Sequence, residues 1–324
     1  MTSLGEFAAE VGPADAGPVT CAGGRTQWSV GGALAGPVRS VRAPAGVVAH
    51  EPGEMIVRVG AGTTLAEVAA VTGAGGQFVT LEADVPDQAT VGGVLACGRS
   101  GVCRLGWGPL RDSVLEVTAV TARGELIRAG APLVKNVTGF DLCRLFVGSV
   151  GTLAFLGEVV LRCHPRPPVE SWWCSEGDPA VDPFAVCAAL YRPLAVLWDG
   201  RRVWVGLAGH PADVADQTRA VLDRAGSFVA VDGPPPRPEG GRRSRPPGRL
   251  AELPVLVPAG GWLAEVGVGI VHCDGAAAAA LDRVVAPAAP AVAELHRRVK
   301  DHFDPGGRLN PGRTPLVRPA QVAS

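Results

Sequence analysis

Residues 89–114, ATVGGVLACGRSGVCRLGWGPLRDSV, and residues 134–157, VKNVTGFDLCRLFVGSVGTLAFLG, decide how this chain is interpreted. Both stretches are dense in glycine, and the block between them is rich in β-branched residues with almost no net charge. Because glycine has no side chain, main-chain N–H groups in such loops can come close to a ligand. The pattern therefore predicts backbone recognition of a large, planar, anionic molecule.

Short glycine turns elsewhere strengthen this interpretation. The motifs, in chain order, are Gly23-Gly24-Arg25-Thr26, Thr90-Val91-Gly92-Gly93, the stretch 106–112 and the stretch 148–153. The first two turns can enclose a diphosphate with backbone donors from both sides. Each turn is weak evidence alone, but the ordered set favours a diphosphate-bearing flavin over a metal or a nucleic acid.

Composition narrows the class of protein. The chain has 324 residues, 47% of them hydrophobic, and a formal net charge of −1. This length is enough for two domains with a sizeable core, and the charge balance predicts no basic face for nucleic acid. No run of 18 apolar residues occurs, so no membrane span is expected. The first residues lack the pattern of a signal peptide. We therefore expect a cytoplasmic protein that reaches a membrane only through partners.

The eight cysteines do not form a metal site. Their spacing contains no C-x-x-C pair and no zinc or iron–sulfur pattern. In a reducing compartment most are expected to be small buried apolar residues.

Lysine is rare in this chain. Of its 30 basic residues, only Lys135 and Lys300 are lysines. Where arginine is the default, a retained lysine can mark a need for a compact charge. Lys135 lies inside the glycine-rich region and is the more interesting of the two, although a chance surface lysine is an equally good explanation.

A second glycine pattern offers a competing interpretation. Gly60-Ala61-Gly62 follows an expected strand and precedes an expected helix, as in a nicotinamide-binding turn. Leu65 occupies the place of the third glycine, and the acids Glu82 and Asp84 fall in a proline-containing loop. An ordinary tight turn between strand and helix explains the pattern better.

The order of these motifs resembles the FAD-binding domain of the vanillyl-alcohol oxidase and p-cresol methylhydroxylase (PCMH) type. Residues 134–142, VKNVTGFDL, and 304–312, DPGGRLNPG, resemble the glycolate oxidase family, and its smaller FAD-binding subunit in particular. The likeness is good over residues 12–165, weaker over 255–314 and nearly absent over 170–254.

The resemblance implies an α+β fold with a two-lobed FAD-binding domain and a cap built on an antiparallel sheet. The proline cluster at Pro165, Pro167 and Pro168 is the expected boundary. We expect the FAD-binding domain over 1–167, the cap over 168–303 with a mobile loop at 233–249, and a carboxyl-terminal tail over 304–324.

The same resemblance implies which residues hold FAD. The two turns would hold the diphosphate, and residues around Gly101, Asp112 and 151–156 would line the flavin or adenine pocket. The expected cofactor residues are Gly23, Gly24, Arg25, Thr26, Thr90, Val91, Gly92, Gly93, Gly101, Asp112, Gly151, Thr152 and Leu156. Residues 22–27 contain no histidine, and Cys97 and Cys103 match no linkage motif, so FAD is expected to be bound non-covalently.

For such a protein we expect FAD-dependent oxidation of a small 2-hydroxy acid. Lys135 is the candidate cation near flavin or substrate, and His272 is the candidate base in the cap. Related dehydrogenases carry a metal motif in the cap, but residues 267–274 hold one histidine and no such cluster, so no metal is expected.

Two other functions stay open. The chain can be an accessory flavin-binding subunit beside a larger flavoprotein subunit and an iron–sulfur subunit, as the resemblance implies. It can also be a nicotinamide-dependent reductase. The reductant of the flavin distinguishes the three functions. A catalytic subunit is reduced by a hydroxy acid on its own, an accessory subunit only when its partners are present, and a nicotinamide-dependent reductase by NADH.

Overall fold

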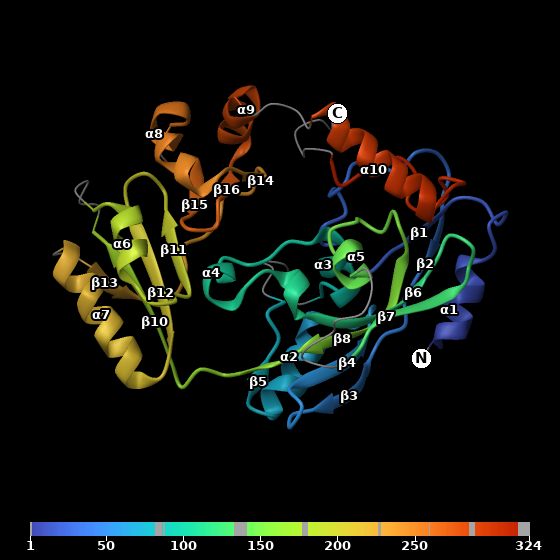
Figure 1. The fold of residues 1–324 in the computed structure, drawn as a ribbon, viewed down its shortest axis with the longest axis horizontal. Coiled ribbons are helices and arrows are strands. Elements are labelled where there is room, and N and C mark those ends of the chain that lie inside the picture. The colour runs from blue at the N-terminus through green and yellow to red at the C-terminus, as the bar shows by residue number, and fades with distance from the viewer. Residues whose placement is uncertain are drawn as a thin grey trace. The chain divides into compact units, whose positions relative to one another are not determined.

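The structure, a computed structural model, describes residues 2–81, 86, 88–132, 141–176, 181–225, 228–258, 260–284 and 289–316. The chain divides into two compact units (Figure 1). Unit 1 comprises residues 1–101, 109–166 and 288–324, and unit 2 comprises residues 102–108 and 167–287. The chain thus enters unit 2 briefly at 102–108, passes into it again after Arg166, and returns to unit 1 at residue 288.

Unit 1 is built on a five-stranded antiparallel sheet. Its order is β3 (Val47–Glu51), β4 (Ile56–Gly60), β8 (Phe155–Arg162), β6 (Val114–Val120) and β7 (Leu126–Gly130). Alternate residues of the strands enter the main core, for example Val57, Val59, Val159 and Leu161. This alternation is what a half-buried strand requires, since successive side chains point to opposite faces.

Smaller elements complete this sheet. β1 (Val19–Cys21) pairs in parallel with β2 (Arg39–Val41), and β5 (Gln77–Phe78) pairs with β9 (His164–Pro165). The helices are α1 (Leu4–Val11), α2 (Leu65–Ala74), α3 (Val91–Cys97), α5 (Leu142–Phe146), α10 (Pro290–Phe303) and the 3₁₀ turn η1 (Leu110–Ser113). α1 and α2 each begin with a capping box, from Ser3 and Glu6 and from Thr64 and Glu67.

Helix α10 differs from the expectation that residues up to 303 belong to the cap. It lies in unit 1, where Val299 and Phe303 pack against the main core. The Phe303 ring meets Phe146 edge-on, with centroids 6.0 Å apart. The helix is amphipathic, and this apolar stripe is buried by unit 1 rather than by the sheet of unit 2.

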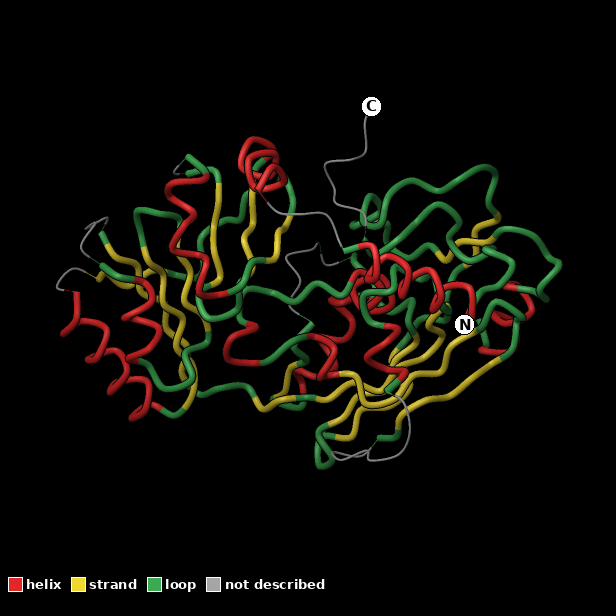
Figure 2. Tube along the Cα trace, turned by 45° about the horizontal axis from the view of Figure 1, so that its top comes forward, coloured by secondary structure: helices red, strands yellow, loops and turns green. Residues whose placement is uncertain are grey.

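Unit 2 contains a seven-stranded antiparallel sheet, seen as yellow strands in Figure 2. The order is β13 (Phe228–Val231), β10 (Val169–Ser175), β12 (Val203–Gly209), β11 (Ala195–Trp198), β15 (Trp262–Glu265), β16 (Ile270–Cys273) and β14 (Arg242–Ser244). Its helices are α4 (Arg104–Trp107), α6 (Pro183–Ala189), α7 (Pro211–Ala225), α8 (Leu253–Leu256), α9 (Gly275–Val284) and the 3₁₀ turn η2 (Pro247–Glu252).

The two faces of this sheet are covered by different parts of the chain. α6 and α7 pack with Val196, Val205 and Leu207 on one face. The opposite residues, such as Leu197 and Trp204, pack with Val102 and Cys103, just before α4. An α+β unit with an antiparallel sheet is therefore confirmed for the second part of the chain.

The expected mobile loop at 233–249 is partly regular. Residues 242–244 form β14 and residue 247 begins η2, whereas residues 233–241 belong to no helix or strand, and the mobility of the loop stays a prediction. β14 pairs with β16 in register, with Arg242 opposite His272. Arg243 is buried and binds Asp282 of α9 through two hydrogen bonds of 2.7 and 2.6 Å. The segment has few apolar residues, so its order comes from strand pairing and a buried ion pair, which composition alone does not reveal.

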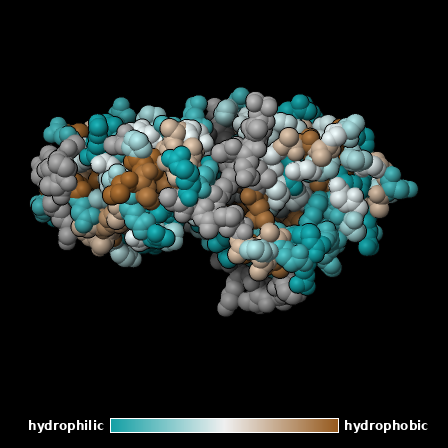
Figure 3. Space-filling model, turned by 90° about the horizontal axis from the view of Figure 1, so that it is seen from above, coloured by the Kyte–Doolittle hydropathy of each residue, from teal (hydrophilic) through white to brown (hydrophobic). Residues whose placement is uncertain are grey.

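Figure 3 shows one face of the molecule, on which hydrophobic residues form patches among hydrophilic ones. None of the helices that the structure describes is both long and apolar enough to pass through a bilayer.

Candidate functional site

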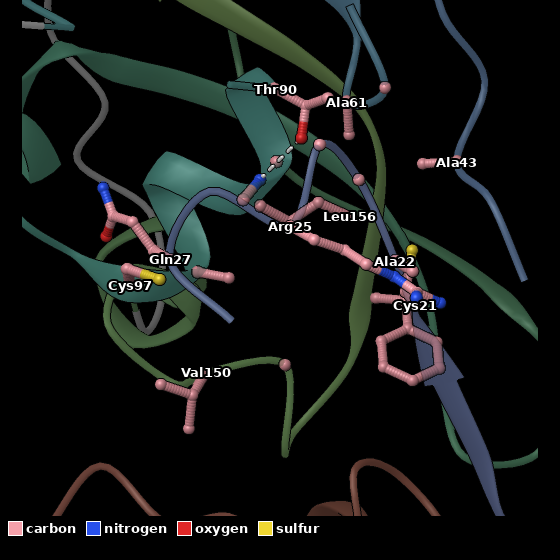
Figure 4. A pocket seen from close by; sticks show the side chains of 18 of the residues that line it. Cys21, Ala22, Arg25, Gln27, Ala43, Ala61, Thr90, Cys97, Val150 and Leu156 are labelled. Atoms are coloured by element: carbon pink, nitrogen blue, oxygen red, sulfur yellow. Dashed lines mark hydrogen bonds between the residues drawn. The ribbon is translucent and has the colours of Figure 1, made fainter. Parts of the chain in front are cut away.

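Unit 1 contains a cavity of about 330 Å³ whose walls come from six parts of the chain. Figure 4 shows Arg25, Thr90, Val150 and Leu156 around this common space. The lining residues fall within 21–30, 42–45, 61–64, 88–97 and 146–156, where not every residue reaches the cavity, and Asn310 and Arg313 complete them.

The first wall is the loop that follows β1. Among the described residues, the backbone N–H groups from Gly23 to Gln27 have no hydrogen-bond acceptor. Arg25 lies in the left-handed region, with φ of +56°. Successive N–H groups that converge in this way form a concave anion-binding site, called a nest. This loop can therefore donate several hydrogen bonds to an anion.

Glycine brings this loop close to the second turn. A Cβ atom added to Gly23 would lie closer than 3.0 Å to Thr90 Oγ1, and one added to Gly24 would come as close to the carbonyl oxygen of Gln88. Backbone and side-chain atoms of the second turn thus fill the space that any other residue would need. The two turns therefore meet as the sequence predicted.

The second turn offers few backbone donors, because three of its four N–H groups are already bonded within the protein. Donation to a diphosphate from both sides therefore stays a prediction that depends mainly on the first turn. The N–H of Val91 donates to the Thr63 carbonyl at 2.9 Å, and that of Gly92 to the Ala61 carbonyl at 2.7 Å. The N–H of Gly93 donates to Thr90 Oγ1 at 3.3 Å. These groups join the start of α3 to the turn at 61–64.

That turn is the one that resembled a nicotinamide site. It follows β4, which is antiparallel to both neighbours, so the parallel arrangement of a Rossmann unit is not present there. Ala61, Gly62 and Thr64 instead line the same cavity as the glycine turns.

The third wall is a strained turn. Val150 has φ of +48°, although it is β-branched, and Gly151 follows with φ of +66°. The Val150 N–H donates to the Ala96 carbonyl at 2.8 Å, and Asn310 Nδ2 donates to the Val150 carbonyl at 2.7 Å. Strained residues held from both sides are characteristic of functional sites.

The cavity has a positive wall. Its lining includes Arg25, Arg42 and Arg313 but no aspartate or glutamate. None of these arginines has a carboxylate partner among the residues that the structure describes. The guanidinium groups of Arg25 and Arg313 lie 4.9 and 4.1 Å from the ring centre of Trp28. Such a wall favours an anionic ligand.

Buried polar atoms on the lining also need partners. Gln27 Oε1, Asn310 Oδ1 and Arg313 Nε are buried without a hydrogen-bond partner. A buried polar atom of this kind is costly unless a ligand or water satisfies it. These three atoms belong to lining residues but have almost no accessible surface, so they are unsatisfied polar groups beside the cavity.

Nine of the expected cofactor residues line the cavity: Gly23, Gly24, Arg25, Thr26, Thr90, Gly92, Gly93, Gly151 and Leu156. The other four do not. Val91 is fully buried, and Gly101 is buried outside the lining. Asp112 pairs with Arg144 at 2.9 Å, and Thr152 Oγ1 donates to the Ser149 carbonyl.

The two expected catalytic residues are not in this cavity. Lys135 lies outside the described residues. His272 lies in β16 of unit 2, where its Nε2 is 2.7 Å from Glu265 Oε1. Burial lowers the pKa of His272 below its usual value, although the Glu265 carboxylate opposes this.

The sequence analysis did not name several lining residues, which include Gln27, Trp28, Arg42, Asn310 and Arg313. A signal existed for Asn310, because it lies in the motif at residues 304–312. Its role becomes clear only when the tail is seen to return to β1, where the Asn310 N–H donates to the Val19 carbonyl at 2.9 Å.

Residues 5–130 match the family model of the FAD binding domain. This match covers less than half of the chain, and the likeness supports FAD as the cofactor. The match ends before the strained turn and the tail, which complete the cavity.

Curated relatives belong to hydroxy-acid metabolism by name. Glycolate oxidase subunit GlcE of Escherichia coli is 35% identical over 154 residues, which is 47% of this chain and 44% of the relative. Glycolate oxidase subunit GlcD of Bacillus subtilis is 42% identical over 78 residues, or 24% of this chain and 17% of the relative. The matches thus span less than half the length of these relatives.

Solved structures support the fold. An alkyldihydroxyacetonephosphate synthase superposes with a TM-score of 0.64 at 14% identity, over 91% of this chain and 71% of that one. Phl p 4, a grass pollen allergen with glucose dehydrogenase activity, superposes with a TM-score of 0.54 at 15% identity. The superposition covers 71% of this chain and 50% of that one. At these identities the likeness concerns the fold alone.

The cavity suits FAD on its own chemistry. A diphosphate carries two negative charges and accepts hydrogen bonds, which matches the N–H groups of 23–27 and the arginine wall. The residues present therefore fit the cofactor.

Proposed function

We propose that the protein is an FAD-dependent oxidoreductase for a small 2-hydroxy acid and acts as a subunit of the glycolate oxidase type. The observation that carries this proposal is the cavity itself. Backbone N–H groups without an acceptor and arginines without a carboxylate partner, among the described residues, line one space there. The substrate class comes from the names of the matched relatives, which include glycolate oxidase subunits and D-lactate dehydrogenases.

Bound FAD supplies the acceptor for the hydride that leaves the substrate carbon. The loop 23–27 orients the cofactor by its diphosphate, and the buried walls around Val150 exclude water. Non-covalent binding is part of the proposal, since hydrogen bonds and charge account for the contacts.

His272 is proposed to take the hydroxyl proton. Its Nε2 is engaged with Glu265, so Nδ1 is the atom left to accept a proton when the ring is neutral. The lowered pKa keeps the ring neutral near pH 7, which a base requires. Lys135 stays a proposed cation near the flavin or the substrate.

One observation favours the second candidate, an accessory flavin-binding subunit. The side chain of His272 is only 9% exposed, and Glu265 beside it is 1% exposed. A base this deeply buried within a sheet is poorly placed to meet a substrate. In this case a larger flavoprotein subunit would carry out the oxidation, and an iron–sulfur subunit would pass on the electrons.

Anaerobic spectroscopy of the purified chain distinguishes these functions. Loss of the oxidised-flavin absorbance on addition of glycolate or D-lactate supports a catalytic subunit. Loss only after a larger flavoprotein subunit and an iron–sulfur subunit are added supports the accessory role. Reduction by NADH but by no hydroxy acid would overturn both. Cell fractionation, with and without the partners, tests a cytoplasmic location with membrane contact only through them.

A further inference from the structure

Arg313 is the least solvated cation of the cavity. Arg25 and Arg42 are exposed, whereas Arg313 is partly buried and its Nε has no hydrogen-bond partner. Its Nη2 donates to the Trp28 carbonyl at 2.8 Å, and the guanidinium stacks on the Trp28 ring. Burial lowers the pKa of Arg313, but a guanidinium remains charged at neutral pH.

The segment before Arg313 is fixed firmly to unit 1. The Arg308 guanidinium donates to four backbone carbonyls, those of Val11, Gly12, Gly17 and Ala122, over 2.6 to 3.0 Å. Asp304 accepts the N–H of Arg308 at 3.1 Å and that of Leu309 at 2.7 Å. The Arg313 N–H then donates to the Asn310 carbonyl at 3.1 Å.

This anchoring places the charge beside the donor loop. Trp28, which supports the guanidinium, directly follows the five residues whose N–H groups lack acceptors. Since the cavity lining holds no carboxylate, the charge of Arg313 is not neutralised by the lining. A buried charge without a counter-charge is unfavourable, so the site is suited to an anion that reaches both Arg313 and the loop.

We propose that Arg313 binds the diphosphate of FAD, so that the cofactor site extends to the carboxyl-terminal tail, far outside the matched residues 5–130. This proposal rests on the cofactor and not on the 2-hydroxy acid as substrate. It assigns the tail a direct part in cofactor affinity.

The test compares the binding of FAD, ADP and riboflavin to wild type and Arg313→Gln by calorimetry. ADP carries the diphosphate without the flavin, and riboflavin carries the flavin without the diphosphate. A lost hydrogen bond to a charged group predicts FAD and ADP binding on the order of 10- to 100-fold weaker. Riboflavin affinity should be unchanged.

Arg123→Gln is the matched control, because Arg123 is an exposed arginine of unit 1 that does not line the cavity. Water and salt screen its charge, so ADP affinity should change by no more than a few-fold. Circular dichroism of the apoprotein shows whether Arg313→Gln folds. If it does not, the same titrations are made with Arg313→Met, whose side chain still packs on Trp28.

Unchanged ADP affinity in the Arg313 variant would overturn the proposal. A loss of riboflavin affinity with ADP affinity intact would also overturn it, because Arg313 would then contact the flavin ring. Failure of wild type to oxidise any hydroxy acid leaves the ADP comparison unaffected, so the two proposals fail separately.

Discussion

Two buried arginines of unit 2 and the three arginines that line the cavity of unit 1 have opposite surroundings. In unit 2, the buried Arg243 and Arg245 each bind a carboxylate, at 2.6 Å to Asp282 and 2.9 Å to Glu252. In unit 1, Arg25, Arg42 and Arg313 line a cavity and have no such partner among the described residues. Paired buried charges maintain a fold, whereas charges that share a cavity without partners indicate a ligand site.

Unit 1 also contains a structural arginine, and its loss should have the largest effect. Arg308→Met leaves four backbone carbonyls without their donor in a buried place. We expect unit 1 to lose about 3 to 5 kcal/mol of unfolding free energy, measured by urea denaturation. Arg123→Met, at an exposed position, should have almost no effect. Equal stability of both variants would contradict the structural role of Arg308.

Arg243→Met tests the corresponding pair in unit 2. Removal of the cation leaves the Asp282 carboxylate without its bidentate partner, and about 3 kcal/mol of stability should be lost. FAD affinity should stay at the wild-type value, because Arg243 does not line the cavity. A large loss of FAD affinity together with normal stability would remove the distinction between the two kinds of arginine.

Gly24→Ala tests the contact between the two glycine turns. The new Cβ would overlap the Gln88 carbonyl, so the loop must move and its N–H groups would no longer converge. FAD affinity should fall by roughly 10-fold or more, as expected when one or more hydrogen bonds to a charged group are lost. Gly53→Ala, where no atom lies near the added Cβ, is the control. Fluorescence titration with FAD measures both, and equal affinities would show that the close approach is unnecessary.

The smallest expected effect is a pH dependence from His272. Its pKa is lowered in the folded protein by burial, so the unfolded chain binds more protons just below pH 6.5. Stability should therefore fall as the pH drops below about 6.5, and level off below the folded pKa. His272→Gln should weaken this dependence, while His164, whose pKa is also lowered, titrates in both proteins. Identical pH profiles would show that His272 does not titrate as the burial implies.

Local sequence was enough for much of the fold and half of the site. Glycine pairs at 23–24 and 92–93 identified turns that do meet, because their spacing and lack of side chains are local properties. Whether a backbone N–H group already has an acceptor is not a local property. The N–H groups of Val91 and Gly92 are used by carbonyls about 30 residues away, which no turn pattern could show.

The tail shows the same limit. Nothing near Asn310 and Arg313 in the sequence indicates that they reach a turn at Val150 or a loop at Trp28.

The contacts of Lys300 could not be predicted from its sequence neighbours either. Its ammonium group donates to the carbonyls of Thr152 and Leu309, at 2.8 and 3.0 Å, and to Asp304. A compact charge with three donors suits this position, which explains one of the two retained lysines structurally.

The central claim is that the loop 23–27 of unit 1 holds the diphosphate of FAD. Hydrogen exchange of the backbone amides, followed by mass spectrometry with and without FAD, tests it most directly. We predict that FAD slows exchange at Gly23–Gln27, because these N–H groups lack acceptors among the residues that the structure describes. Exchange should change little at Val91 and Gly92, which already have acceptors. Saturating FAD that leaves exchange at Gly23–Gln27 unchanged would contradict the account.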